Sequence, residues 1–370
     1  MKKIAIIGAS YLQLPLIEKA QEMGYETHVF AWEAGDVGET VADYFYPISI
    51  REKEEILDKC KEIGIDGIIS IASDLAMVTV NYVADEMGLI GNSWDSTFMS
   101  TNKYAMRKAF YDNGDPIPFF FEVEGGTNGY SIGNIKFPVI VKPTDRSGSR
   151  GVTKVYEATD FESAINKAIY ESFEKKAIVE EYVQGKEYSV EGVSYKGRHT
   201  ILAYTEKFTT GDPHYIETGH MEPAHLGSET KRMIDGIICH ALSSLKIEYG
   251  ASHSEIKIDE DGNIRIIEIG ARMGGDLIGS DLVKLSTGID YVRAVIDIAM
   301  GDAPNLKPVS DNIGSYAVKY ILTKADIDYY ERMRRESPER IDKIIGYHPE
   351  KLTDFNDSSE RNAGVFVYRI

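Results

Sequence analysis

Short apolar runs alternate with helical patterns over the first ninety residues, and this alternation constrains the fold more than any other feature. The run KIAIIGAS (3–10) is typical of a buried strand, LIEKAQEMG (16–24) has apolar residues at helical spacing, and ETHVFAW (26–32) is again strand-like. The alternation recurs at 54–64, 65–73 and 75–88. It predicts a small parallel α/β domain over residues 1–97, with helices on both faces of the sheet. The phosphate-binding pattern GxGxxG is absent, so the sequence supports no dinucleotide site.

Composition excludes several classes of protein. The chain has 370 residues, of which 43% are hydrophobic and 27% charged, as expected for a soluble globular protein of two or three domains. Its net charge of -18 would repel a phosphate backbone, so nucleic acid is not expected as a partner. The two cysteines fit a reducing compartment, and no uncharged run is long enough to cross a membrane. We therefore predict a cytoplasmic protein.

Residues 253–275, HSEIKIDEDGNIRIIEIGARMGG, place two carboxylates in an unfavourable position. Asp261-Gly262 predicts a two-residue hairpin turn in which Glu260 pairs with Asn263. Counting outward along both strands, Glu255 then lies opposite Glu268 on the same face. Like charges in such a pair destabilise a hairpin, so the pair requires an explanation.

The central part of the chain contains two lysines and a loop rich in glycine and serine. Lys103 lies in STNKYAMRKAF (100–110), which is typical of a capped helix, and Lys142 lies in the strand-like FPVIVKP (137–143). Lys142 shares a strand face with Ile140, so on an inner strand it would need a partner. The alternative is that Lys142 lies on an edge strand, where a lysine prevents aggregation. The following TDRSGSRGVTKV (144–155) could point several backbone N–H groups at one anion. A flexible hairpin connection would have the same composition.

The segment AIVEEYVQGKEYSVEGV (177–193) runs from an apolar strand through a turn into a second strand. Its first half could offer backbone groups to the edge of an adenine, and Glu187 could offer a carboxylate to ribose hydroxyls. A solvated acidic turn is the alternative interpretation.

Together and in this order, these motifs resemble the ATP-grasp superfamily from about residue 3 to residue 300. The likeness is greatest to the amino acid ligases that form dipeptides, because EIGARMGGD (268–276) and ETGHMEP (217–223) resemble their substrate-side segments. The resemblance implies an ATP-grasp fold of mixed α/β and α+β class, with the small parallel domain preceding it. It implies an ATP-grasp region over 98–300 with a mobile lid at about 115–190. Residues 301–370 would be a C-terminal α/β extension that completes the ligase core.

The resemblance also implies ATP-binding and metal-binding residues. Lys103 and Lys142 match the lysines that hold the ATP phosphates, and Glu187 matches the ribose-binding carboxylate. Glu255 and Glu268 match the ligands of Mg²⁺, with Mn²⁺ as an alternative metal, and a cation between them would explain the opposed charges. The covering loop and the adenine hinge, which would use main-chain groups, contain Ser147, Gly148, Ser149, Gly151, Glu180, Glu181 and Val183.

On the substrate side, Arg272 resembles the arginine that binds the acyl phosphate and stabilises the tetrahedral intermediate, although it could instead pair structurally with the two glutamates. Glu217 and His220 correspond to a catalytic glutamate and histidine, with an ordinary surface histidine as the alternative for His220. The chain departs from the family at Gly270, where many members have a metal-binding asparagine. No role is assigned to His214, His225 or His253. A substrate-contacting loop is expected at Gly274, Gly275 and Asp276.

The implied activity is that of an ATP-dependent carboxylate–amine ligase. It would form an amide or peptide bond through an acyl phosphate and release ADP and phosphate. Its partners would be a small-molecule carboxylate and amine, with amino acids favoured, and a homodimer is compatible with this function. A bicarbonate-activating or purine-pathway ligase is one alternative, although ETGHMEPAHLG (217–227) lacks a basic cluster for a phosphorylated substrate. A regulatory protein that binds ATP without turnover is the other.

Overall fold

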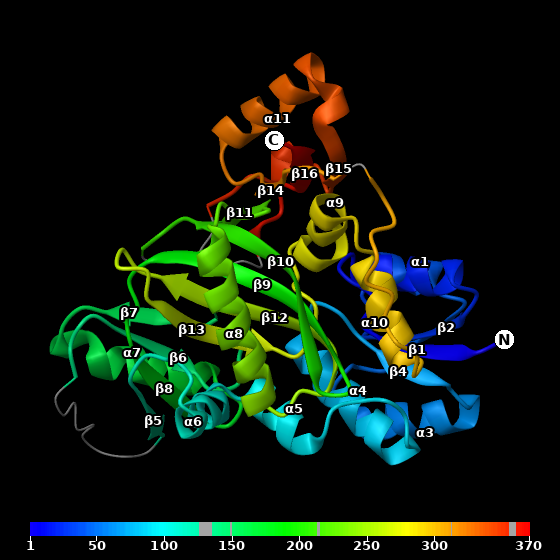
Figure 1. Cartoon of the computed structure of the whole chain (residues 1–370), viewed down its shortest axis with the longest axis horizontal. Coiled ribbons are helices and arrows are strands. Elements are labelled where there is room, and N and C mark those ends of the chain that lie inside the picture. The colour runs from blue at the N-terminus through cyan, green and yellow to red at the C-terminus, as the bar shows by residue number, and fades with distance from the viewer. Residues whose placement is uncertain (126–134, 149, 213–214, 312, 355–359) are drawn as a thin grey trace.

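The computed structural model of the chain describes residues 1–125, 135–148, 150–212, 215–311, 313–354 and 360–370. Within these ranges the strands form three sheets, of four, eight and four strands. Figure 1 shows the N-terminal sheet on the right, the large sheet in the centre and the second small sheet at the lower left. Across the same ranges, no helix is both long enough and apolar enough to cross a membrane.

The N-terminal unit consists of β1 (Lys3–Ile7), α1 (Leu14–Glu22), β2 (Glu26–Phe30), α2 (Val37–Val41), β3 (Tyr44–Tyr46), α3 (Lys53–Ile63), β4 (Gly67–Ile69) and α4 (Asp74–Met87). Its four strands are parallel, in the order β3-β2-β1-β4. Because side chains alternate along a strand, Ile4 and Ile6 pack with α1 while Ala5 and Ile7 pack with α3 and α4. The predicted small parallel sheet with helices on both faces is confirmed.

The second small sheet and its flanking helices consist of α5 (Trp94–Thr101), α6 (Lys103–Asn113), β5 (Phe120–Glu124), β6 (Val139–Pro143), β7 (Thr153–Val155), α7 (Ala158–Glu171) and β8 (Lys176–Glu181). The strand order is β5-β8-β6-β7, and α7 packs on one face through Phe161 and Ile165 against Val139 and Val141. This sheet and helix lie within the segment predicted to be a lid.

The large sheet is built from β9 (Lys186–Tyr195), β10 (Arg198–Thr209), β11 (Glu217–Glu222), β12 (Tyr249–Ile258) and β13 (Ile264–Gly270). Three further strands, nearer the C-terminus, complete it. Helix α8 (Ser228–Ser244) lies across one face, where Ile238 and Leu242 share an apolar core with Val190 and Ile256. The π-helical turn η1 (Ile278–Leu282), α9 (Val283–Thr287) and α10 (Tyr291–Ala299) follow β13. Helix α10 packs against α1 and so joins the large sheet to the N-terminal unit.

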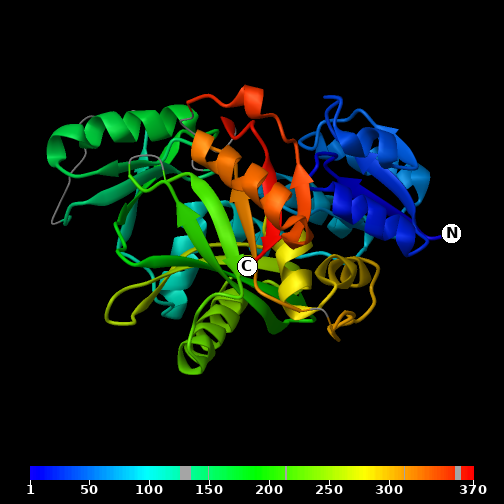
Figure 2. The ribbon, with the colours of Figure 1, turned by 90° about the horizontal axis from the view of Figure 1, so that it is seen from above.

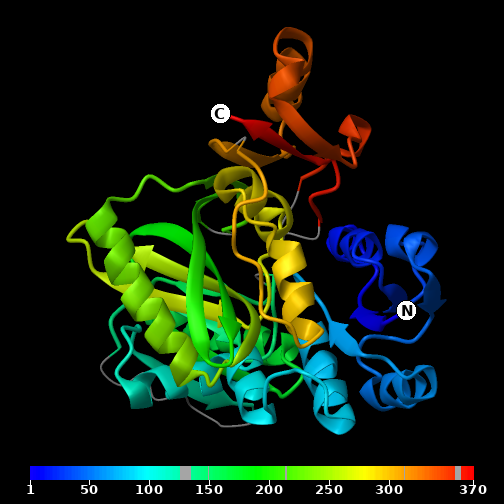
Figure 3. The ribbon, with the colours of Figure 1, turned by 45° about the vertical axis from the view of Figure 1, so that its right-hand side comes forward.

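The C-terminal residues add β14 (Tyr316–Tyr320), α11 (Lys324–Glu336), β15 (Ile341–Ile345) and β16 (Val365–Arg369), with short 3-10 turns at Pro338–Arg340 and Pro349–Lys351. Strand β14 pairs with β11 and with β16, so the tail extends the large sheet in the order β11-β14-β16-β15. Strands β14 and β16 pair with each other, and α11 lies between them in the sequence. Figure 3 shows this extension above the rest of the molecule.

The hairpin between β12 and β13 confirms one part of the sequence prediction and corrects another. Glu255 does lie opposite Glu268. The predicted pair of Glu260 with Asn263 is wrong, because Asp259 pairs with Asn263 around a three-residue turn in which Gly262 has a φ of 82°. A register shift between Glu255 and Ile256 then inserts one residue into β13 and restores the predicted opposition.

A buried carboxyl in β11 gives the sheet a testable pH dependence. Glu222 is fully buried, and its oxygens accept hydrogen bonds from the hydroxyls of Thr205 at 2.6 Å and of Ser286. Burial raises the pKa of Glu222 to about 8. Between its ordinary pKa and this value the folded protein holds a proton that the unfolded chain releases. Stability should therefore be full at acid pH and fall as the pH rises toward the folded pKa.

We expect Glu222→Gln, which stays neutral at every pH, to raise the free energy of unfolding by about 1 to 3 kcal/mol at about pH 9 and to flatten its pH dependence. Urea unfolding of the parent and the variant at about pH 6 and about pH 9 measures this. Equal pH slopes for the two proteins would contradict the raised pKa.

Candidate functional site

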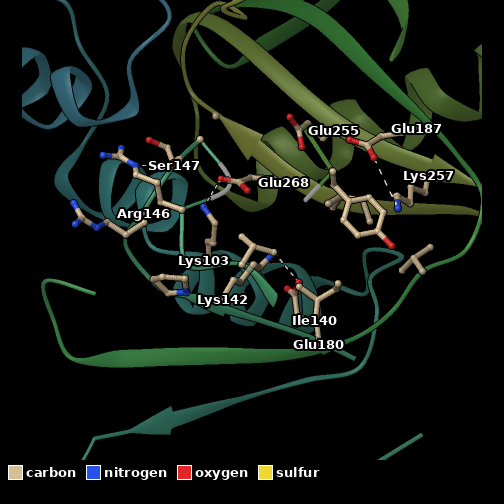
Figure 4. A pocket seen from close by; sticks show the side chains of 18 of the residues that line it. Lys103, Ile140, Lys142, Arg146, Ser147, Glu180, Glu187, Glu255, Lys257 and Glu268 are labelled. Carbon is tan, nitrogen blue, oxygen red and sulfur yellow. Dashed lines mark hydrogen bonds and ion pairs between the residues drawn. The ribbon is translucent and has the colours of Figure 1, made fainter. Parts of the chain in front are cut away.

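A pocket between the large sheet and the second small sheet collects most of the predicted site residues. Figure 4 shows Lys103, Lys142 and Glu180 on one side of it, with Glu187, Glu255 and Glu268 on the strands opposite. The predicted residues that line it are Lys103, Lys142, Ser147, Gly148, Glu180, Glu181, Val183, Glu187, Glu217, Glu255, Glu268 and Arg272. Ser149 lies outside the described residues.

Lys103 reaches the pocket because a helix begins at that residue. The side chain of Asn102 caps α6 by accepting from the backbone N–H groups of Tyr104 and Ala105, at 3.1 and 3.0 Å. The preceding Ser100 and Thr101 belong to α5, so the capped helix starts later than the segment STNKYAMRKAF suggested. The Lys103 ammonium lies 2.6 Å from a carboxylate oxygen of Glu268. Burial opposes the charge of Lys103, but Glu268 outweighs burial and raises the lysine pKa.

Lys142 lies on an inner strand, not on an edge. Strand β6 is paired on both sides, with β8 and β7, and the side chain is buried. Its ammonium is 2.6 Å from Glu180, whose other oxygen is 2.6 Å from the guanidinium of Arg107. Burial lowers the pKa of Lys142, whereas Arg107 and Lys142 outweigh burial and lower the pKa of Glu180. The lowered pKa disfavours the charged form of Lys142 and favours the charged form of Glu180. The two results agree, because two cations share this single carboxylate.

The Glu180 side chain therefore has a structural role that the sequence did not predict. The resemblance to the ATP-grasp superfamily implied a role only for the main chain of Glu180. Its carboxylate, however, is buried and pairs with two cations, one from α6 and one from β6. One anion between two cations leaves this part of the pocket with an excess of positive charge. Such a site favours an additional anion.

Glu255 and Glu268 each have a cationic partner from the protein, so the opposed charges in the hairpin are already compensated. The ammonium of Lys207 on β10 lies 2.8 Å from Glu255 and 3.0 Å from Glu187, and it is 3.9 Å from Glu217. Burial opposes the Lys207 charge, but Glu255 and Glu187 raise its pKa well above the ordinary value. The protein itself thus supplies positive charge beside both glutamates, in addition to the cation that the resemblance implies.

The pair nevertheless fits a divalent metal ion. Among the residues described here, no cluster of three or more His, Cys, Asp or Glu side chains is arranged to hold a metal by itself. Glu255 and Glu268 supply two hard oxygen donors that face one pocket. Mg²⁺ is usually held by one or two carboxylates, with water and phosphate oxygens completing its coordination. The residues present are thus sufficient for a shared metal but not for a metal bound by protein alone.

At Gly270, where the resemblance leads to an expected asparagine, a side chain would lie close to Asp74. A Cβ at this position would be 2.7 Å from a carboxylate oxygen of Asp74. Asp74, at the start of α4 in the N-terminal unit, forms two hydrogen bonds with the guanidinium of Arg272, at 2.9 and 3.0 Å. Strand β13 ends at Gly270, so Arg272 enters the pocket from the following loop. Its partner is Asp74 and not the two glutamates of the hairpin, which the sequence had offered as an alternative.

The loop and hinge that would border a nucleotide come from β6, β7 and β8. Arg146, which the sequence did not single out, lines the pocket and donates to the Glu171 carbonyl at 2.7 Å. Gly151 does not line the pocket. At the hinge, the Lys154 ammonium lies 3.7 Å from the centre of the Tyr182 ring and 3.0 Å from the Tyr215 hydroxyl. This contact ties β7 to the loop before β11.

The remaining substrate-side residues lie beside the pocket and do not line it. His220 is in β11 and is buried, so the alternative of an ordinary surface histidine is wrong. Its Nε2 lies 3.4 Å from a carboxylate oxygen of Asp276. Gly274 donates its N–H to the buried Glu191 at 3.0 Å, and a Cβ there would lie 2.5 Å from that carboxylate. Gly275 has more room, with its nearest neighbour Ala72 at 3.6 Å from an added Cβ.

His253, to which no role was assigned, belongs to the pocket. Its Nδ1 contacts Glu191 and its Nε2 is 3.5 Å from Glu255. Burial opposes protonation, but Glu191 and Glu255 outweigh burial and raise the pKa of His253 to about 9. The position of His253 two residues before Glu255, on the same strand face, was a signal in the sequence. Asp74, Arg107, Glu191 and Lys207 had no comparable signal because their partners are distant in the chain.

A family model described as "ATP-grasp domain" matches residues 135–281, which include the hinge, β9 to β13 and the loop after them. The chain therefore contains an ATP-grasp domain. Alanine–anticapsin ligase of Bacillus subtilis is 27% identical to the chain over 305 residues, which cover 71% of the chain and 62% of that ligase. The chain thus spans less than two thirds of the length of this curated relative.

Solved structures share the fold of the whole chain. An L-amino acid ligase from Bacillus licheniformis has a TM-score of 0.82 at 22% identity, covering 100% of this chain and 93% of that one. A phosphoribosylglycinamide synthetase from Anaerococcus prevotii has a TM-score of 0.75 at 20% identity, covering 100% and 94%. The predicted ATP-grasp fold with a small preceding parallel domain is confirmed.

Proposed function

We propose that this protein is an ATP-dependent carboxylate–amine ligase that forms an amide or peptide bond and uses an amino acid as a substrate. One observation carries the proposal. A single pocket brings together two buried lysines, two opposed carboxylates and a partly buried arginine, from helix α6, strand β6, the β12–β13 hairpin and the loop after it. Cations suit a nucleoside triphosphate, carboxylates suit a shared Mg²⁺, and an arginine suits an activated carboxylate.

The ATP phosphates would lie near Lys103 and Lys142. Lys142 and Arg107 share the single carboxylate of Glu180, so an additional anion would balance their charge. The backbone of the loop around Ser147 and Gly148 would cover them, and Arg146 adds a further positive charge. Main-chain groups of Glu180, Glu181 and Val183 would contact the adenine. Glu187, which lines the same pocket, would hold the ribose.

Mg²⁺ held by Glu255 and Glu268 would supply charge neutralisation at the phosphate oxygens, and Mn²⁺ could replace it. In the absence of ATP the ammonium groups of Lys103 and Lys207 hold the carboxylates of Glu268 and Glu255 in place. Burial would raise the pKa of Glu255, but Lys207 and His253 outweigh burial and lower that pKa well below its ordinary value. The carboxylate is therefore ready to accept a metal.

The reaction would proceed in two steps. The substrate carboxylate attacks the γ-phosphorus of ATP, and ADP leaves as the acyl phosphate forms. The amine then attacks the acyl carbon, and the carbon–oxygen bond breaks to release phosphate. Arg272, held by Asp74 at one end of the pocket, would stabilise the oxyanion of the second step. The second small sheet would act as a lid over about residues 115–190 and exclude water.

Relatives support an amino acid substrate, but they leave an alternative. An alanine–anticapsin ligase and an L-amino acid ligase are among the similar proteins, and so is a phosphoribosylglycinamide synthetase. On the substrate side, Arg272 and Arg361 are both paired with aspartates. A site for a phosphorylated substrate would be expected to present its arginines to that phosphate.

Hydroxylamine trapping tests this proposal. We expect the protein, incubated with Mg-ATP, hydroxylamine and pooled amino acids, to release ADP and to form an amino acid hydroxamate. Without hydroxylamine, mass spectrometry should detect a product equal in mass to two components less one water. Release of AMP would contradict the acyl phosphate route. ADP release that depends on bicarbonate and not on an amino acid would favour the alternative ligase, and binding of ATP without any ADP release would indicate a regulatory protein.

A further inference from the structure

An arginine from the C-terminal extension reaches the substrate side of the pocket. The guanidinium of Arg361 makes two hydrogen bonds with the carboxylate of Asp276, both 3.0 Å long. It also donates to the Glu217 carbonyl at 3.4 Å and lies 4.0 Å from the Glu217 carboxylate. Figure 2 shows the extension between the second small sheet and the N-terminal unit, directly above the large sheet. Arg361 therefore joins the tail to a residue that lines the pocket.

The arginine is fixed in place by its surroundings. Its guanidinium carbon lies 3.8 Å from the centre of the Tyr320 ring on β14, and its side chain is only 10% exposed. Burial disfavours the ionised form of Asp276, but His220 and Arg361 outweigh burial and hold the pKa of Asp276 far below its ordinary range. Two parallel hydrogen bonds to a carboxylate set an arginine in one orientation, which a single ammonium could not do.

The Arg361 pair also stabilises an unusual backbone. Asp276 and Leu277 have φ values of 53° and 63°, in the left-handed region that non-glycine residues rarely adopt. These residues end the loop that begins at Gly274 and lead into η1. Such a conformation persists only where neighbouring groups hold it, and the two hydrogen bonds from Arg361 to Asp276 are contacts of this kind. Asp276 in turn is the nearest carboxylate to Nε2 of His220.

Resting on the proposed ligase function, we propose that Arg361 is a positioning residue that determines which amine the ligase accepts. It holds the 274–277 loop, and through Asp276 and Glu217 it sets the wall of the amine site. The tail thereby contributes to specificity without contacting ATP. The first step, which would use Lys103, Lys142 and the carboxylates of the hairpin, should depend on Arg361 much less than the second.

The test compares two nucleophiles in the same enzyme. Hydroxylamine is small and needs little of the amine site, whereas an amino acid must be held by it. With pooled amino acids, we expect Arg361→Ala to lower the ratio of amide product to hydroxamate about tenfold or more, and to raise the KM of the amine more than it lowers kcat. Arg361→Lys, which keeps the charge but loses the two-bond geometry, should recover part of the ratio.

Arg340→Ala is the matched control, because Arg340 lies in the same extension and donates to the Arg369 carbonyl at 2.9 Å, away from the pocket. It should keep the parent ratio. If Arg361→Ala does not fold, Arg361→Lys alone decides, and a ratio equal to that of the parent overturns the proposal. A parent enzyme that forms neither hydroxamate nor amide would contradict the ligase function itself, which separates the two failures.

Discussion

Replacing Lys142 with alanine is expected to lower turnover about 10²- to 10³-fold while leaving the fold intact. The loss follows from removing a charge-assisted contact with the transferred phosphate. The fold should survive because Glu180, the partner of Lys142, keeps its second partner Arg107 at 2.6 Å. Removing Lys142 leaves a balanced ion pair and not an isolated buried charge.

ADP release and circular dichroism measure the two parts of this prediction. Lys108→Ala is the matched control, because Lys108 lies on the outer surface of α6 in an exposed pair with Asp112. That variant should turn over at the parent rate. If the Lys142 variant also did so, Lys142 would not be a phosphate ligand.

Replacing Glu268 with glutamine is expected to reduce turnover by a similar factor and to remove most of the thermal stabilisation that Mg-ATP gives the parent. The variant keeps the shape of the side chain but lacks the anionic oxygen that a shared metal requires. The sequence alone would predict a more stable metal-free protein, since one of two opposed charges disappears. The structure reverses that sign, because Glu268 compensates the buried Lys103 at 2.6 Å. We therefore expect the metal-free free energy of unfolding to fall by about 1 kcal/mol.

Thermal melts with and without Mg-ATP, run beside an ADP assay, measure all three effects. Glu260→Gln is the control, because Glu260 is an exposed glutamate in the turn of the same hairpin, outside the pocket. Full turnover and full ligand-induced stabilisation in the Glu268 variant would show that the hairpin does not hold the metal.

Local periodicity was sufficient to predict much of the fold. Alternating apolar patterns report burial within one element, so they predicted the N-terminal parallel sheet without any knowledge of distant residues. The order of the motifs identified the ATP-grasp fold and twelve of the residues that line the pocket, because their spacing along the strands is local. The opposition of Glu255 and Glu268 was predicted as well, although the turn was assigned one residue too short.

Only the tertiary structure decided which charges meet. The sequence by itself determined that Lys103, Lys142, Glu255, Glu268 and Arg272 belong to one kind of site. It could not show that Lys207 compensates Glu255, that Asp74 holds Arg272 and occupies the space above Gly270, or that Arg361 reaches Asp276. Ion pairs depend on distances of a few ångströms between elements far apart in the chain, and periodicity carries no information on such distances. The sequence therefore determined the elements and the chemical groups, whereas packing of the three sheets determined their partners and so their charge balance.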